Sequence, residues 1–339
     1  MRKFYYPIKD VSLYEEYPTR QTGMDEILEV GKTTEGDYSI RSLLEFDIAS
    51  ISASISAGTI DGSANFDLKV FSALQDRIIV GQVLALYPVS QSWVEGQGYF
   101  YQDRLEETSG ATWSQRDTGS LWANSGSSYL SGSEVSGSED DANDFTFDVT
   151  DIIRSWVSGS ISNYGAVLKF SDFDESNLSN TGCYKFYSRQ THTVYSPMLV
   201  AKWDDSTYNT GSMDAAPDTG LIVYPANLRP AYRTDENVRI DLVARAQYPL
   251  KTFDTQFTAW QTHYLPATSY FSIIDAQSKE VIIPFDDYSK VSEDSSGPFV
   301  NFTIQNMHPR RFYLFLIKVV TSTGYEYVFD NNYTFTITL

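Results

Sequence analysis

Two tryptophans stand in a stretch that is otherwise rich in glycine, serine and other polar residues, TSGATWSQRDTGSLWANSG at positions 108–126. A surface that binds sugar needs an aromatic ring face beside polar side chains that can hydrogen-bond to hydroxyl groups. Such side chains follow the first tryptophan directly. The candidate residues for binding a glycan or a protein partner are Trp113, Gln115, Arg116, Asp117 and Trp122.

The same two tryptophans have a second interpretation, as framework residues. Where almost nothing else in a loop can bury apolar area, a large aromatic side chain anchors that loop on the end of a β-sandwich. Trp93 and Trp156 have a similar setting. We favour this interpretation, which leaves Gln115, Arg116 and Asp117 as residues held out toward a glycan or a neighbouring subunit.

An acidic run, SEDDAND at 138–144, could bind a cation. Clustered carboxylate oxygens are the ligands that calcium prefers, and the candidate ligands are Asp140, Asp141 and Asp144. The run lacks the glycine-punctuated spacing of an EF-hand loop, so a solvated loop is the favoured interpretation. We therefore expect no cofactor, with calcium as the alternative.

No arrangement typical of an enzyme's catalytic residues stands out in the sequence. The three histidines are far apart, and neither a His-Glu-x-x-His pair nor a Gly-x-Ser-x-Gly turn is present. Glu106 and Glu107 are adjacent acids of the kind that a glycosidase uses. With 44 acidic residues in the chain, adjacent acids are expected without any function, so we expect a non-enzymatic protein.

Charge and hydropathy exclude two classes of partner. The net charge of −19 opposes nucleic-acid binding, which requires clustered Lys and Arg. No window reaches the roughly 18 consecutive apolar residues of a membrane span, and the N-terminus MRKFYYPIKDVSLYEEYPTR lacks the apolar region of a signal peptide. We therefore expect a protein made in a cytoplasm, with neither a nucleic-acid nor a membrane partner. The single cysteine, Cys183, excludes an intramolecular disulfide.

Alternating apolar and polar residues predict an all-β protein, with early strands at 39–51 and 64–74. One clear helix is expected in the first half, near 150–157, with Asp148 or Thr150 as its N-terminal cap.

The composition of 204–221 changes to polar residues with Pro and Gly, which predicts a linker between domains at 1–203 and 222–339. About seven strands without disulfides predict an immunoglobulin-like sandwich for the second domain. Its aromatic-rich stretch at 248–271 is interpreted equally well as an interaction surface or as sandwich interior.

Five ordered blocks within residues 1–203 resemble the DNRLRE domain, a β-sandwich module related to carbohydrate-binding modules. The blocks are SLLEFDIASI, SWVEGQG, GATWSQRDTGSLW, FDVTDIIRSWVSGSISNYGAVLKF and KFYSRQTHTVYSPMLVAKW. The resemblance implies a jelly-roll-like β-sandwich. Members often belong to secreted or surface-anchored bacterial proteins, and some bind acidic polysaccharide. This chain has SGSSYLSG after Trp122, where the family commonly shows a Gly-Gly-Asp element.

Three further segments, KDVSLYEEYPTRQTGMDEILEVGK, VIIPFDDYSKVS and VFDNNYTFTI, resemble virion structural proteins of tailed phages, particularly marine phages with contractile tails. This resemblance implies a structural component of the virion, in the tail, neck, baseplate or decoration. The implied partners are other virion structural proteins, further copies of the chain in a homo-oligomer and, weakly, a host-surface glycan. The alternative is a carbohydrate-binding module of a bacterial surface or polysaccharide-utilisation system.

Overall fold

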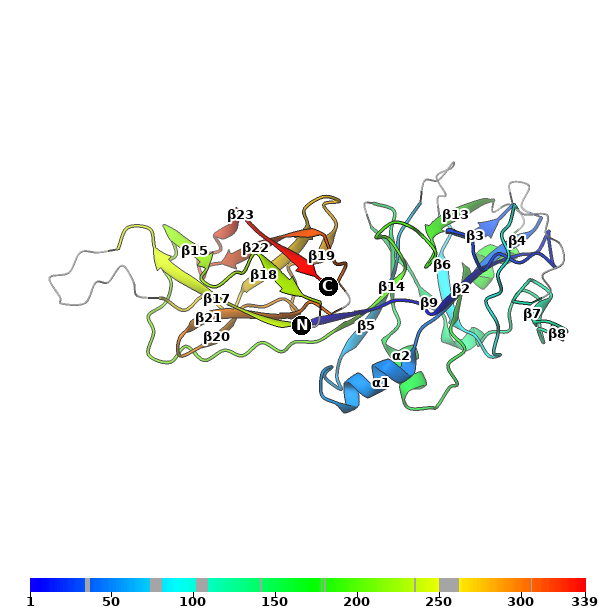
Figure 1. Cartoon of the computed structure of the whole chain (residues 1–339), viewed down its shortest axis with the longest axis horizontal. Coiled ribbons are helices and arrows are strands. Elements are labelled where there is room, and N and C mark those ends of the chain that lie inside the picture. The colour runs from blue at the N-terminus through cyan, green and yellow to red at the C-terminus, as the bar shows by residue number, and fades with distance from the viewer. Residues whose placement is uncertain are drawn as a thin grey trace. The chain divides into compact units, whose positions relative to one another are not determined.

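Strands make up 43% of the chain and helices 8% in the computed structural model, which confirms the all-β prediction. The structure describes residues 1–33, 37–73, 81–101, 109–140, 142–177, 179, 181–234, 236–249, 262–305 and 307–339. The chain divides into two compact units (Figure 1). The N-terminal unit is Tyr5–Ala201, and the C-terminal unit joins Met1–Phe4 to Lys202–Leu339.

Two sheets form the β-sandwich of the first half. The first sheet has the strand order β1 (Arg2–Tyr5), β14 (Met198–Lys202), β5 (Asn65–Val70), β11 (Phe145–Asp148), β10 (Ser138–Glu139). The second has the order β13 (Gly182–Tyr187), β3 (Ile27–Lys32), β4 (Ser39–Glu45), β12 (Ala166–Phe170), β6 (Leu84–Pro88), β9 (Val135–Ser136), with β2 (Lys9–Tyr14) also beside β4. A small hairpin pairs β7 (Gln115–Asp117) with β8 (Ser120–Leu121).

The pattern of β5 shows why these segments form strands. Phe66, Leu68 and Val70 are buried and alternate with the half-buried Asp67 and Lys69, so one face of the strand packs into the sandwich. The predicted strand at 64–74 is confirmed in this part.

The helices differ from the sequence-based prediction. The expected strand at 39–51 ends at Glu45, and helix α1 (Ile48–Ser56) begins beyond Asp47, whose carboxylate accepts a hydrogen bond from Ser50 N at 3.2 Å. The expectation of a single clear helix in this half is therefore wrong. The alternation of Ile and Ser in IASISASIS suits a strand, whereas the Asp47 cap and packing against α2 favour the helix (Figure 1).

Helix α2 (Thr150–Val157) confirms the predicted helix. Its N-cap residue is Val149, whose apolar side chain accepts no hydrogen bond, but Asp148 Oδ1 accepts from Thr150 N, the first amide of the helix, at 3.1 Å. The Thr150 hydroxyl accepts from Phe66 N at 2.9 Å and does not cap the helix. The remaining short elements are α3 (Asp172–Ser176) and a 3₁₀ turn, η1 (Ser131–Ser133). Among the described residues, no helix is long and apolar enough to cross a membrane.

The C-terminal unit has the strand order of an immunoglobulin-like sandwich. One sheet runs β15 (Leu221–Pro225), β17 (Asn237–Ala246), β21 (Gly297–Thr303), β20 (Ser292–Asp294). The other runs β16 (Ala231–Arg233), β23 (Glu326–Thr338), β22 (Phe312–Val320), β18 (Ser269–Asp275), β19 (Val281–Ile283), with β16 and β23 parallel. Taken in chain order, the first sheet corresponds to immunoglobulin strands A, B, E and D, and β18, β22 and β23 correspond to C, F and G. The predicted immunoglobulin-like fold is confirmed.

The residues expected to link the two domains are bound to this unit. Glu293 N donates to Thr207 O at 2.8 Å, Asn209 N donates to Glu293 O at 3.1 Å, and Ala216 N donates to Tyr264 O at 2.9 Å. The predicted linker is therefore wrong at 204–216, which we call the strap. The strap is held by backbone hydrogen bonds, which do not require apolar side chains at regular intervals. The sequence therefore shows no hydrophobic pattern that would predict its attachment.

Met1–Phe4, expected in the first domain, also belongs to the C-terminal unit. The Met1 amino group donates to Asp205 Oδ1 and to Tyr288 O, both at 2.8 Å. Of the aromatic-rich stretch, positions 250–261 lie outside the described residues.

Tyr313 near the start of β22 provides a further immunoglobulin-like feature. Its ring is buried, and its hydroxyl donates to the backbone oxygen of His308, five residues upstream, at 2.8 Å. This is the arrangement of a tyrosine corner.

We predict that Tyr313→Phe lowers the free energy of unfolding by about 1–2 kcal/mol, because the His308 carbonyl loses this donor inside the protein. Urea denaturation of the full chain measures the change. The matched control is Tyr325→Phe, on an exposed ring, which we expect to change stability by no more than about 0.5 kcal/mol. Equal effects of the two substitutions would remove the corner as a source of stability.

Candidate functional site

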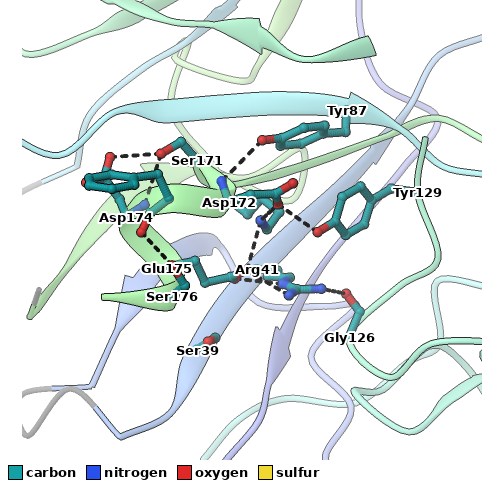
Figure 2. A network of polar contacts seen from close by, with 12 residues as sticks. Ser39, Arg41, Tyr87, Gly126, Tyr129, Ser171, Asp172, Asp174, Glu175 and Ser176 are labelled. Carbon is teal, nitrogen blue, oxygen red and sulfur yellow. Dashed lines mark hydrogen bonds and ion pairs between the residues drawn. The ribbon is translucent and has the colours of Figure 1, made fainter. Parts of the chain in front are cut away.

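Helix α3 is fixed at both ends although it has only five residues. Ser171 Oγ accepts from Asp174 N at 3.1 Å, and the buried Asp174 carboxylate accepts from Ser171 Oγ at 2.9 Å and from Val83 N at 2.8 Å (Figure 2). At the other end, Lys32 Nζ donates to the backbone oxygens of Glu175 and Asn177 at 2.7 and 3.1 Å. These bonds satisfy backbone groups that a short helix leaves unpaired.

The side chain of Glu175 joins two cations from different strands. Arg41 of β4 binds it through two parallel hydrogen bonds, Nε to Oε1 and Nη2 to Oε2, both at 2.8 Å (Figure 2). Lys169 of β12 binds Oε2 at 2.8 Å as well. Because Lys169 is 0% exposed, its charge must be compensated inside the protein, and Glu175 supplies much of that compensation.

Asp172 and two tyrosines complete the surroundings of Lys169. Asp172 Oδ1 lies 2.6 Å from Lys169 Nζ and accepts from the Tyr129 hydroxyl at 2.8 Å. The rings of Tyr87 and Tyr129 lie 5.2 and 5.1 Å from the ammonium group. Partial burial by itself would raise the pKa of Asp172, but the hydrogen bonds from Lys169 and Tyr129 outweigh it and hold the pKa below its usual value. Asp172 is therefore ionised at neutral pH.

Trp113 is attached to the same network. The Arg41 guanidinium lies 5.0 Å from the Trp113 ring centroid, and Arg41 Nη1 donates to Gly126 O at 2.7 Å. Gly126 has φ +74°, and a Cβ there would lie 2.7 Å from the Trp113 ring. The loop therefore folds back tightly on the tryptophan, and only glycine fits at this point.

Trp113 and Trp122 are 7% and 5% exposed. Trp122 Nε1 donates to Thr112 O at 2.8 Å, and both rings belong to one apolar cluster with Trp93 and Tyr87. Their faces are therefore covered by protein, which agrees with the framework interpretation and not with a sugar-stacking platform.

The polar residues that follow Trp113 are half-buried and shape the β7–β8 hairpin. Arg116 Nη1 donates to Ser92 O at 3.0 Å, Gln115 Oε1 accepts from Gly119 N at 3.3 Å, and Asp117 Oδ1 accepts from Thr118 N at 2.7 Å. Contact of Gln115, Arg116 and Asp117 with a glycan or a subunit stays a prediction.

The acidic run does not bring three carboxylates together in the part of the chain that the structure describes. Asp140 Oδ1 accepts from the backbone of Ala142 and Asp144 at 2.9 and 3.0 Å. The buried Asp144 carboxylate accepts from Ser72 N at 2.8 Å and lies 3.5 Å from Lys69 Nζ. These two candidate calcium ligands therefore stabilise their own loop, and Asp141 lies outside the described residues.

Asp10 is a buried carboxyl group outside this network, and its partners are structural. Asp10 is covered by protein and accepts from Arg189 N at 2.6 Å, while Arg189 Nη1 binds both oxygens of Glu95 at 2.9 Å. Burial raises the pKa of Asp10 to about 7. Such a value would suit a general acid, but the group is inaccessible to a substrate. The adjacent acids Glu106 and Glu107 lie outside the described residues.

The structure reveals an aromatic patch that the sequence analysis missed. We define it as Tyr17, Arg20, Phe100 and Tyr101. Tyr101 is 92% exposed, and its ring makes an edge contact with Phe100 at 5.0 Å. Arg20 lies 4.9 Å from the centroids of both Tyr17 and Phe100, and its Nη1 donates to Phe100 O at 2.6 Å.

The aromatic patch adjoins the tryptophan loop, because Ser114 N donates to Pro18 O at 3.0 Å. The run GYFY at 98–101 was visible in the sequence. Its partners Tyr17 and Arg20 lie about eighty positions away, so no local pattern could join them.

No family model matches the chain, and no curated protein matches it. Among solved structures, the whole chain aligns with a DUF4785 family protein from Legionella pneumophila subsp. pneumophila str. Philadelphia 1, at 8% sequence identity and a TM-score of 0.23. The chain spans 62% of the length of that protein.

We predict that Glu175→Gln destabilises the protein by about 3–5 kcal/mol, because it removes the charge that compensates two largely buried cations. Chemical denaturation followed by tryptophan fluorescence measures the loss, since Trp113 lies against Arg41. Glu26→Gln is the matched control, because the Glu26 side chain is exposed and its neighbour is the exposed His192. Similar stability of the two variants would contradict the structural role of the network.

Proposed function

We propose that this chain is a non-enzymatic structural component of a tailed-phage virion, in its tail, neck, baseplate or decoration, and that it acts by binding other virion proteins. The observation that carries the proposal is the aromatic patch. Tyrosine and arginine are the side chains that most often dominate the energy of protein interfaces. The patch places the exposed rings of Tyr17 and Tyr101 beside Phe100 and a stacked arginine.

The patch is held in a fixed conformation, which lowers the entropy that a partner must remove on binding. Arg20 stacks on Tyr17 and Phe100 and donates to the backbone of Phe100. The Asp25 carboxylate accepts from Phe100 N at 3.2 Å and supports the same segment from within the unit. A preorganised surface of this kind suits permanent assembly.

The charged network of Figure 2 supports assembly in preference to catalysis. Glu175, Arg41 and Lys169 bind one another, and Asp172 is bound by Lys169 and Tyr129. Groups that pair this closely fix the protein's shape and are not available to transfer protons to a substrate. The high negative charge further favours a partner with basic groups over a second copy of the chain.

Glycan binding is the second candidate, in a carbohydrate-binding module of a bacterial surface or polysaccharide-utilisation system. The exposed ring of Tyr101 favours it. An aromatic ring can pack against the apolar face of a sugar, while a neighbouring hydroxyl and guanidinium can hydrogen-bond to the sugar's hydroxyl groups. The site for such a ligand would be the aromatic patch, since Trp113 and Trp122 are buried.

We predict that mass spectrometry of purified particles of the encoding phage detects the chain, and that Tyr101→Ala reduces its amount in the particles at least tenfold. The reason is the loss of the most exposed aromatic side chain of the patch. Tyr325→Ala, at another exposed tyrosine that lies in the C-terminal unit, is the control and should be incorporated normally. Absence of the wild-type chain from the particles would reject the virion proposal.

A glycan array with the same two variants tests the second candidate. Under the assembly proposal we expect no glycan to bind in a manner that depends on Tyr101. Binding by the wild type and by Tyr325→Ala, but not by folded Tyr101→Ala, would instead favour a carbohydrate-binding module.

A further inference from the structure

Glu293 in the edge strand β20 is a buried carboxyl group with an incomplete set of partners. The residue is 1% exposed. Its Oε1 accepts from Leu265 N at 2.7 Å, whereas its Oε2 is buried without a hydrogen-bond partner among the described residues. An ionised carboxylate in such a position loses its hydration and gains few hydrogen bonds to compensate for that loss.

The strap defined above, 204–216, covers this group. Its backbone brackets that of Glu293, with Glu293 N donating to Thr207 O at 2.8 Å and Asn209 N donating to Glu293 O at 3.1 Å. Between these two contacts, the Tyr208 hydroxyl donates to the oxygen of Leu265 at 2.8 Å. The strap therefore closes over the two residues whose contact buries the carboxyl group.

No neighbouring charge compensates an ionised Glu293 in the described structure. On its own strand, Asp294 repels it. Arg239, on β17 of the same sheet, binds Asp294 Oδ2 at 2.6 Å and Asp241 Oδ1 at 2.8 Å. The titratable groups of the strap are Asp204, Asp205, Tyr208 and Asp214, and the segment beside it adds His263 and Tyr264. Asp204 is paired with Lys290, and Asp205 is paired with the Met1 amino group.

We propose that the strap is a pH-sensitive closure of the C-terminal unit, which is held shut while Glu293 is protonated and opens more often once Glu293 is ionised. Opening breaks the Tyr208–Leu265 and backbone contacts and admits water to the carboxylate. The proposal is independent of the virion role and rests on the burial of Glu293 beneath a hydrogen-bonded strap.

The direction of the pH effect follows from the two states of the carboxyl group. Burial, with the repulsion of Asp294, raises the pKa of Glu293 to about 7 while the strap is closed, against 4.5 when it is exposed to water. The closed state therefore binds more protons between these values, and its stability falls as the pH rises through this range and levels off above it. From pH 6 to pH 8, the opening equilibrium should increase about tenfold.

Hydrogen exchange followed by mass spectrometry on the full chain tests this expectation. Exchange of peptides covering 204–216 is measured at pH 6 and pH 8 and corrected for the intrinsic effect of pH on exchange rates. In the wild type we expect protection of the strap to fall about tenfold, while peptides from β17 and β22 keep their protection. Glu293→Gln keeps the acceptor for Leu265 N without the charge and should abolish the pH dependence. Asp330→Asn, at an exposed carboxylate of β23, should preserve it.

A second substitution separates strap closure from folding. Tyr208→Phe removes the hydroxyl bond to Leu265 and should raise exchange of the strap at both pH values, leaving the ratio between them unchanged. Strap protection that is independent of pH in the wild type would overturn the proposal. So would a Glu293→Gln variant that retains the tenfold change.

Discussion

The structure of the N-terminal unit depends on compensating two cations that are buried away from water. Lys169 is entirely enclosed and Arg41 nearly so, and both rely on the carboxylate of Glu175. Desolvation of a charge is tolerated only where partners are fixed in position. The residues around α3 supply that fixation, since the N-cap at Ser171, the buried Asp174 and the ammonium of Lys32 all hold the five-residue helix in place.

The position of the tryptophan loop follows from the same constraint. Arg41 uses its remaining guanidinium nitrogen on the Gly126 carbonyl and its planar face on Trp113. A segment with few apolar residues is thereby attached to the sandwich by charge as well as by two buried rings. This loop is in turn attached to the adjoining aromatic patch, because Ser114 N donates a hydrogen bond to the backbone oxygen of Pro18. A surface that is fixed in this manner suits recognition by shape.

The two units treat buried charge in opposite ways. In the N-terminal unit, Arg41 and Lys169 each have carboxylate and aromatic partners, so the network is rigid. In the C-terminal unit, the described residues give Glu293 one donor for its two oxygens and a negatively charged neighbour. A complete set of partners offsets the cost of desolvating a charge, whereas an incomplete set leaves that cost in place and favours the neutral, protonated form of a carboxyl group.

The sequence by itself determined the all-β class and the immunoglobulin-like second half. Those features depend on the alternation of apolar and polar residues along single strands, as in β17, where Val238, Ile240 and Leu242 are buried. Such alternation can be recognised from the sequence alone. It also indicated that Trp113 and Trp122 anchor a loop, since few other apolar residues were available there.

Only the tertiary structure decided the strap, helix α1 and the charged network. Arg41, Lys169 and Glu175 become partners through the pairing of β4 with β12 and the turn into α3, and no spacing in the sequence expresses that pairing. Burial and compensation of charge are properties of positions in space, so they appear only once the strands are placed side by side.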